Sequence, residues 1–169
     1  MQINLRAFCI HGFAGAPWPG CGPSVGMGSL ASTLTEAGIR ATAHSHGILW
    51  YENVPSISNL ASDAARAGHK IILVGHSMGA NAATRVACSL ALSGHKVALL
   101  AALDPVEFCC PQIPNNVERA MCFTGSINWI GGILRPNQHF PAGRMSHQFV
   151  HSTHRGIDDH HEIHQSILS

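Results

Sequence analysis

The sequence predicts an α/β fold: a mostly parallel sheet of about six strands with helices on both faces. Short β-rich runs alternate with helical patterns along the 169 residues, and several of these runs are apolar throughout. Consecutive parallel strands need a long crossover, and a helix usually supplies it. Strands without polar alternation are typical of a parallel sheet covered on both faces.

Two strand patterns are apolar at almost every position. The runs "KIILVGH" (70–76) and "KVALLAALD" (96–104) are therefore expected to be buried on both faces. The expected strands, in chain order, are 3–10, 39–46, 70–76, 96–104, 117–125 and 146–151.

The first three helical patterns end at glycines, which favour the left-handed conformation that closes a helix. The clearest one covers 79–94, where Val86 and Leu90 belong to one apolar stripe and Gly94 follows the last turn. In the closing helix, Asp159 and Glu162 have the spacing of an N-cap residue and its N3 partner. The expected helices are 28–38, 56–68, 79–94 and 158–168.

Length and composition favour one globular domain over residues 1–169. The chain is 46% hydrophobic and long enough to bury a sizeable core, and it shows no internal repeat or linker. Two long connections stand out, 12–27 and 124–146. Long loops in a compact α/β domain are usually functional.

Charge and hydropathy limit the partners that we expect. The formal net charge is +1 with scattered cationic residues, so no nucleic-acid surface is expected. No apolar run reaches about 18 residues, so no membrane span is expected. The N-terminal sequence lacks the pattern of a signal peptide, and we expect a cytoplasmic protein. No cofactor is expected.

The six cysteines are expected to be free thiols. No C-x-x-C pair occurs, which excludes zinc-ribbon spacing. Cys9, Cys88 and Cys122 fall in expected strands or helices, whereas Cys109 and Cys110 lie in a proline-bounded loop that is open to oxidation.

The stretch "IILVGHSMGANAA" (71–83) places Ser77 between an expected strand and an expected helix. The pattern G-x-S-x-G in this context predicts a sharp turn that exposes the serine hydroxyl as a nucleophile. Its glycines leave room for the neighbouring strand and helix. A tight turn without chemistry is the alternative interpretation.

The turn after the first expected strand, "HGFAG" (11–15), is rich in glycine. Such a turn can direct backbone N–H groups at an oxyanion, together with the N–H of the residue after the nucleophile. We therefore expect Phe13 and Met78 to supply the oxyanion-hole donors.

A serine nucleophile needs a base and an acid that orients the base. Asp104 directly follows the strand after the nucleophile helix, in "LLAALDPV", and is the candidate acid. Several of the 13 histidines come later in the chain. We favour His154, in the loop before the closing helix, and keep His151 as the competing candidate.

The motifs "HGFAG", "VGHSMGA", "ALDP" and "THRGIDDHHEIHQSIL" together resemble the α/β-hydrolase superfamily, in particular its small lipase- and esterase-like members. The resemblance covers nearly the whole chain and implies a minimal version of that fold without a cap domain. Many members place the acid one strand later, near residue 124 here, where no carboxylate stands.

The resemblance implies a serine hydrolase that cleaves carboxylic esters of small molecules or lipids through an acyl-enzyme. A thioesterase, an acyltransferase and a non-catalytic binding protein are the alternatives. The two long loops carry Trp18, Trp129, Ile133 and Leu134, which indicate either an apolar acyl site or core packing. Trp18 and Trp129 are the substrate-binding candidates. Zinc binding by His160, His161 and His164 is a weaker alternative, because no H-E-x-x-H occurs.

Overall fold

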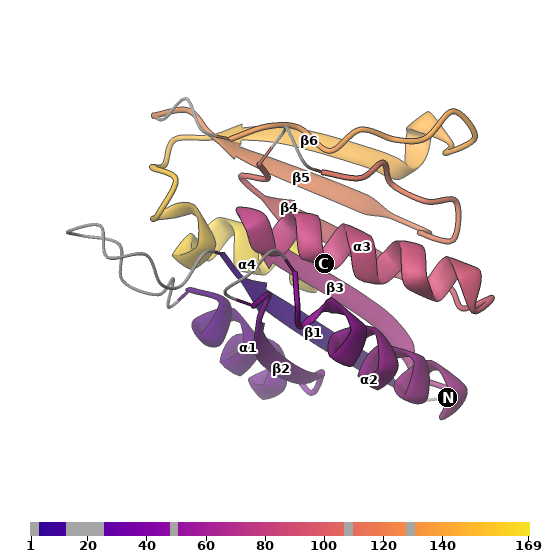
Figure 1. Ribbon diagram of the computed structural model, residues 1–169. Coiled ribbons are helices and arrows are strands. Elements are labelled where there is room, and N and C mark those ends of the chain that lie inside the picture. Colours follow the sequence, from indigo (N-terminus) through magenta and orange to yellow (C-terminus); the bar gives the residue numbers. More distant parts are fainter. Residues whose placement is uncertain (1–3, 13–25, 48–50, 107–109, 128–130) are drawn as a thin grey trace.

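The computed structural model describes residues 4–12, 26–47, 51–106, 110–127 and 131–169, which form a six-stranded sheet with helices on both faces (Figure 1). The strand order is β2-β1-β3-β4-β5-β6, and every neighbouring pair is parallel. The predicted fold class is therefore confirmed.

The strands and helices lie close to their expected positions. The strands are β1 Leu5–His11, β2 Arg40–Ser45, β3 Lys70–His76, β4 Leu99–Leu103, β5 Ala120–Gly125 and β6 Met145–Val150. The helices are α1 Gly26–Glu36, α2 Val54–Arg66, α3 Met78–Leu92 and α4 His161–Leu168, with short 3₁₀ turns η2 Ala142–Arg144 and η3 Ile157–Asp159.

The closing helix differs from its prediction. It begins at His161 rather than 158, because residues 157–159 form the separate turn η3. Its N-cap residue is His160, which makes no side-chain capping bond, so the capping box of Asp159 and Glu162 is wrong. The spacing fits a cap, but residues 157–159 form a tight turn in which Asp158 is buried, so the helix starts after them.

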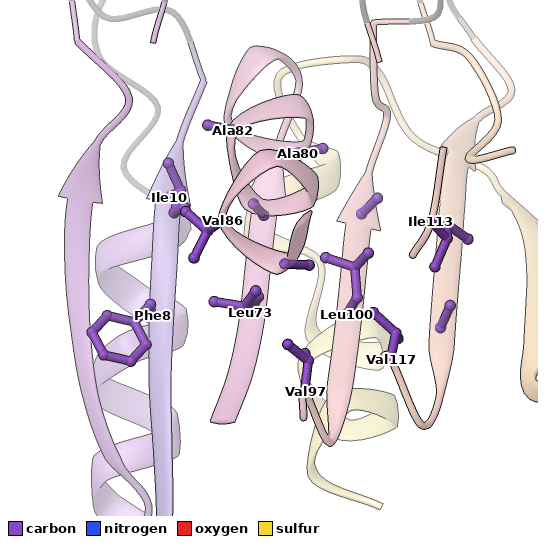
Figure 2. Packing of buried hydrophobic residues seen from close by; sticks show 14 of the residues in the cluster. Phe8, Ile10, Leu73, Ala80, Ala82, Val86, Val97, Leu100, Ile113 and Val117 are labelled. Carbon is purple, nitrogen blue, oxygen red and sulfur yellow. The ribbon is translucent and has the colours of Figure 1, made fainter. Parts of the chain in front are cut away.

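Apolar residues cover both faces of the sheet. Helices α2 and α3 pack over one face, where Phe8, Leu73 and Leu100 are fully buried (Figure 2). Helices α1 and α4 pack over the other, around residues such as Leu34 and Ile163. This explains why β4 and β5 are buried at every position, whereas the edge strands β2 and β6 keep exposed residues.

The described cysteines are free thiols, namely Cys9, Cys88, Cys110 and Cys122; Cys21 and Cys109 lie outside the described residues. Burial raises the pKa of Cys9 to about 12 and that of Cys122 to about 11, so both stay protonated and pack as small apolar groups. Within the described ranges, no helix is long and apolar enough to cross a membrane.

The carboxyl ends of all six strands lie at one edge of the sheet, since the strands are parallel. At this edge His76, the last residue of β3, pairs in register with Leu103, the last residue of β4. The residues that follow them, Ser77 and Asp104, therefore leave adjacent strands at the same level.

The turn from β3 to α3 is packed so closely that only glycine fits two positions before and two positions after Ser77. A Cβ added at Gly75 would lie 2.2 Å from the carbonyl oxygen of Gly79, and one added at Gly79 would lie 2.2 Å from that of Ile10 in β1. Real Cβ atoms do not approach backbone this closely, so a side chain at either position would push α3 away from the sheet.

We predict that Gly79→Ala destabilises the protein by roughly 1–3 kcal/mol or more, because the added methyl group overpacks the contact between α3 and β1. Gly28→Ala is the matched control, since Gly28 also lies in the first turn of a helix and a Cβ there meets nothing within 4 Å. Urea unfolding of both variants measures the difference. Equal free energies of unfolding for the two variants would contradict the close packing of the turn.

Candidate active site

Ser77 occupies a strained backbone conformation between β3 and α3. Its φ is 55° and its ψ is −124°, which is rare for a residue with a side chain. Its N–H donates to the carbonyl of Leu103 at 2.8 Å, and its own carbonyl accepts from the N–H of Ala80 at 3.0 Å. These bonds hold the strained turn and keep the hydroxyl at the strand-end edge.

Asp104 is fully buried directly after β4. Its φ is 50°, a left-handed conformation that aspartate adopts more readily than most residues, and its N–H donates to the carbonyl of Phe123 at 2.7 Å. The carboxylate oxygen Oδ1 accepts from the N–H of Gly125 at 3.0 Å. A Cβ at Gly131 would lie only 1.6 Å from the same oxygen, so Gly131 lies directly against the carboxylate.

His154 joins the other two residues by hydrogen bonds. Its Nδ1 lies 2.6 Å from Oδ2 of Asp104, and its Nε2 lies 3.0 Å from Oγ of Ser77. Because a carboxylate only accepts, Nδ1 carries the hydrogen and Nε2 of the neutral ring is free to accept from the serine hydroxyl. The side chain of His154 is 17% exposed, so the site is partly open to solvent.

The competing candidate, His151, lies exposed just beyond the end of β6. The structure thus brings Ser77, Asp104 and His154 into one chain of hydrogen bonds from the ends of three different strands. These are the residues that the sequence analysis favoured for nucleophile, acid and base.

The oxyanion-hole candidates are described only in part. Met78 is the first residue of α3, and the first N–H groups of a helix have no partner within the helix. Gly12 passes close to the serine, because a Cβ built on it would lie 3.1 Å from Cβ of Ser77. Phe13 lies outside the described residues, as do Trp18 and Trp129.

The two other apolar loop residues differ in exposure. Leu134 is 1% exposed and belongs to the core under α3, so it is not available to a substrate. Ile133 is 42% exposed and stays a candidate for an apolar contact.

Thr124 stands at the end of β5, where many superfamily members keep the acid. Its hydroxyl donates to the carbonyl of Gly132 at 3.1 Å and lies 3.0 Å from Nε2 of His147. The next residue, Gly125, instead gives its N–H to Asp104. The end of β5 therefore supports a carboxylate that comes from the neighbouring strand.

The sequence analysis missed three residues that surround the candidate triad. Gly125 and Gly131 contact Asp104, and His76 donates from Nε2 to the carbonyl of His154 at 2.7 Å. The sequence showed a histidine beside the serine, but its partner is 78 positions away, and no local pattern indicates that contact.

The histidines considered for zinc are arranged differently from a metal site. His164 is buried, and its Nε2 donates to the carbonyl of Asp158 at 2.8 Å. Among the residues that the structure describes, no group of three or more His, Cys, Asp or Glu side chains is placed to hold a metal ion.

Comparison with solved structures finds the same fold at low sequence identity. A putative hydrolase of the alpha/beta superfamily from Xanthomonas campestris pv. campestris is 14% identical, with a TM-score of 0.63 over 97% of this chain and 94% of that one. The RedJ thioesterase from the prodiginine pathway of Streptomyces coelicolor is 14% identical, with a TM-score of 0.66 over 98% and 88%.

An alpha-beta serine hydrolase homologue from Coxiella burnetii is 16% identical, with a TM-score of 0.61 over 99% of this chain and 86% of that one. No curated protein matches the sequence. The model of the alpha/beta hydrolase family matches residues 5–160, nearly the whole chain. This chain belongs to the alpha/beta hydrolase family.

Proposed function

We propose that the protein is a serine hydrolase that cleaves carboxylic esters through an acyl-enzyme on Ser77. The observation that carries the proposal is the unbroken chain of hydrogen bonds from Asp104 through His154 to Ser77, at 2.6 and 3.0 Å. The strained backbone of Ser77 supports it, because strain of this kind is usually kept only where a side chain must be presented.

In the proposed acylation, Nε2 of His154 removes the hydroxyl proton as Oγ of Ser77 attacks the ester carbonyl carbon. The C–O bond to the alcohol then breaks, and the imidazolium returns its proton to the leaving alkoxide. A water molecule attacks the acyl-enzyme in the same way, with His154 as base, and releases the acid and the free serine.

The negative charge on the tetrahedral oxygen needs donors near Ser77. We propose the backbone N–H of Met78 as one donor, at the positive end of α3, and that of Phe13 as the second. Gly12, which precedes Phe13 in the sequence, lies beside the serine.

The burial of Asp104 supports its role as the acid. A buried carboxylate is costly unless it is hydrogen-bonded, and this one accepts from Gly125 and from His154. With water excluded, its charge acts strongly on the imidazolium that forms during the reaction.

The substrate is proposed to be a small-molecule or lipid ester with an apolar acyl group. Ile127 and Ile133 are both about half exposed and belong to the loop after β5. Trp18 and Trp129 are proposed to complete the apolar wall of the acyl site.

A thioesterase or acyltransferase is the second candidate, because the same triad geometry serves either reaction. Several structural neighbours are described as thioesterases, including the RedJ enzyme, the NocB thioesterase domain and the surfactin thioesterase domain SrfTE. A panel of p-nitrophenyl esters of increasing chain length, matched acyl thioesters and added alcohol acceptors separates the three activities.

We predict that Ser77→Ala abolishes labelling by a fluorophosphonate probe and removes essentially all ester hydrolysis, because the nucleophilic oxygen is lost. Labelling is read by mass spectrometry of the intact protein, and circular dichroism checks the fold. Ser126→Ala is the control, since Ser126 follows β5 and has no proposed role. Continued labelling of folded Ser77→Ala would refute Ser77 as the nucleophile.

We predict that Asp104→Asn lowers kcat by roughly 10⁴, because the amide no longer favours the Nδ1–H tautomer of His154. His154→Ala should lose a comparable factor, and His151→Ala, at an exposed position, should keep the wild-type rate. Steady-state kinetics with one short ester measures all three variants. A fully active His154→Ala, or an inactive His151→Ala, would reassign the base.

A further inference from the structure

His76 connects the proposed nucleophile to the proposed base. It directly precedes Ser77, and its Nε2 lies 2.7 Å from the carbonyl oxygen of His154. A carbonyl only accepts, so Nε2 of His76 carries a hydrogen and donates it. The ring is 4% exposed, and its centroid lies 4.9 Å from that of His154.

The other nitrogen of the same ring faces a buried carboxyl group. Nδ1 of His76 lies 3.7 Å from Oδ2 of Asp158, which is 1% exposed in the turn η3. In the part of the chain that the structure describes, this Nδ1 has no hydrogen-bond partner. The ring thus makes a hydrogen bond through Nε2, and its Nδ1 faces a carboxyl group.

We propose that His76 and Asp158 form a positioning pair that holds the main chain of His154 in place relative to Ser77. The inference rests on the proposed function, in which His154 is the base. One imidazole then links the strained turn after β3 to the loop after β6, and Asp158 keeps that imidazole in its orientation.

Besides the bond from His76, the N–H of Ile127 reaches the loop of His154 and donates to the carbonyl of Ser152 at 3.3 Å. The N–H groups of Gly156 and Ile157 both donate to the carbonyl of Thr153, which shapes the loop only locally. The bond from His76 comes from a different strand, so it fixes where the loop lies against the serine. A displacement of about 1 Å in a catalytic group can cost roughly 100-fold in rate.

The pKa values of both groups of the pair are displaced towards their uncharged forms. Burial, together with proximity to His154, lowers the pKa of His76 to about 4, and burial raises the pKa of Asp158 to about 6. His76 is therefore neutral at pH 7, with Nδ1 as an acceptor. The carboxyl group of Asp158 can donate to it only in its protonated form, which becomes the major form as pH falls below about 6.

Other charged or titratable groups also face the pair. The pKa of His76 is lowered by His154 and His11 and raised by Asp104. The pKa of Asp158 is raised by Asp159 and lowered by His154. The backbone N–H of Gly26 bonds to Asp158 and favours its ionised form, and His164 donates to the backbone carbonyl of Asp158. Burial outweighs these effects, so the pKa of Asp158 stays above its ordinary value in the folded protein.

The first test compares His76→Leu with His76→Gln. Gln carries its amide nitrogen as many bonds from Cα as His carries Nε2, so it keeps a donor to the carbonyl of His154, whereas Leu removes it. We predict that His76→Leu lowers kcat by about 10- to 100-fold with KM close to that of the wild type, and that His76→Gln recovers most of the loss. His46→Leu, at another buried histidine beyond β2, is the control and should keep its kcat.

The second test uses Asp158. Asp158→Asn imitates the protonated carboxyl group, so it should keep most of kcat, whereas Asp158→Ala should lower kcat about 10-fold. The folded-state pKa of Asp158 lies above its ordinary 3.8, so its ionisation costs stability as pH rises from 3.8 through about 6. Asp158→Asn should therefore raise Tm by a few degrees above pH 6, and the gain should disappear near pH 4.

A nuclear magnetic resonance experiment tests the pair without any substrate. The Nδ1–H proton of His154, identified by its loss in His154→Ala, should shift or broaden in His76→Leu and return in His76→Gln. The ¹⁵N shifts of His76 should report the Nε2–H tautomer at pH 7. An unchanged His154 proton in His76→Leu, or an Nδ1–H tautomer of His76, would overturn the inference.

The outcomes separate this inference from the proposed function. If the wild type neither labels with fluorophosphonate nor hydrolyses any ester, the proposed function fails, and the resonance experiment alone decides on the pair. If the wild type is active but His76→Leu keeps its kcat, or His76→Gln loses as much as His76→Leu, only the positioning pair is refuted. If His76→Leu does not fold, the kcat values of His76→Gln, Asp158→Asn and Asp158→Ala test the positioning pair instead.

Discussion

The close approach of the β3–α3 turn to β1 is the constraint on which the candidate site depends. Gly79 lies against the carbonyl groups of Ile10 and His11, and Gly75 lies against the backbone of α3. This contact lets α3 start directly at the end of β3, so Ser77 is left in a strained turn at the edge of the sheet. With a longer or looser connection, the serine would lie elsewhere and the helix N-terminus would not face it.

The parallel sheet supplies the second requirement, which is that distant residues meet. Since His76 and Leu103 pair in register, Ser77 and Asp104 emerge side by side from neighbouring strands. Asp104 is also bound to the next strand, β5. The carbonyl of Phe123 accepts a hydrogen bond from its N–H, and the N–H of Gly125 donates to its carboxylate. Asp104 is thus fixed by its position after β4 and by its bonds to β5. The loop after β6 then places His154 within hydrogen-bond distance of it.

The base comes from a loop, the least regular of the elements that meet at the site. Hydrogen bonds tie His154 to the other elements: its ring donates to Asp104, and its main-chain carbonyl accepts from the ring of His76. A hydrogen-bonded polar cluster buried beside the sheet is costly to disrupt, because each lost partner leaves a polar group without water. The proposed chemistry and the packing of this edge therefore rest on the same contacts.

The sequence by itself determined the alternation of strands and helices, because apolar runs and glycine stops are local signals. It also indicated Ser77, Asp104 and His154 as candidates, since Ser77 and Asp104 directly follow strands and His154 lies in the loop after the last strand, in the order that the resemblance implies. The early part of the closing helix was predicted wrongly, because the burial of Asp158 and the turn η3 are tertiary effects. Only the tertiary structure decided that Leu134 packs in the core, that Gly125 and Gly131 enclose the acid, and that His76 reaches the carbonyl of His154. These contacts join residues up to 78 positions apart, and no pattern along the chain records which strand ends lie side by side.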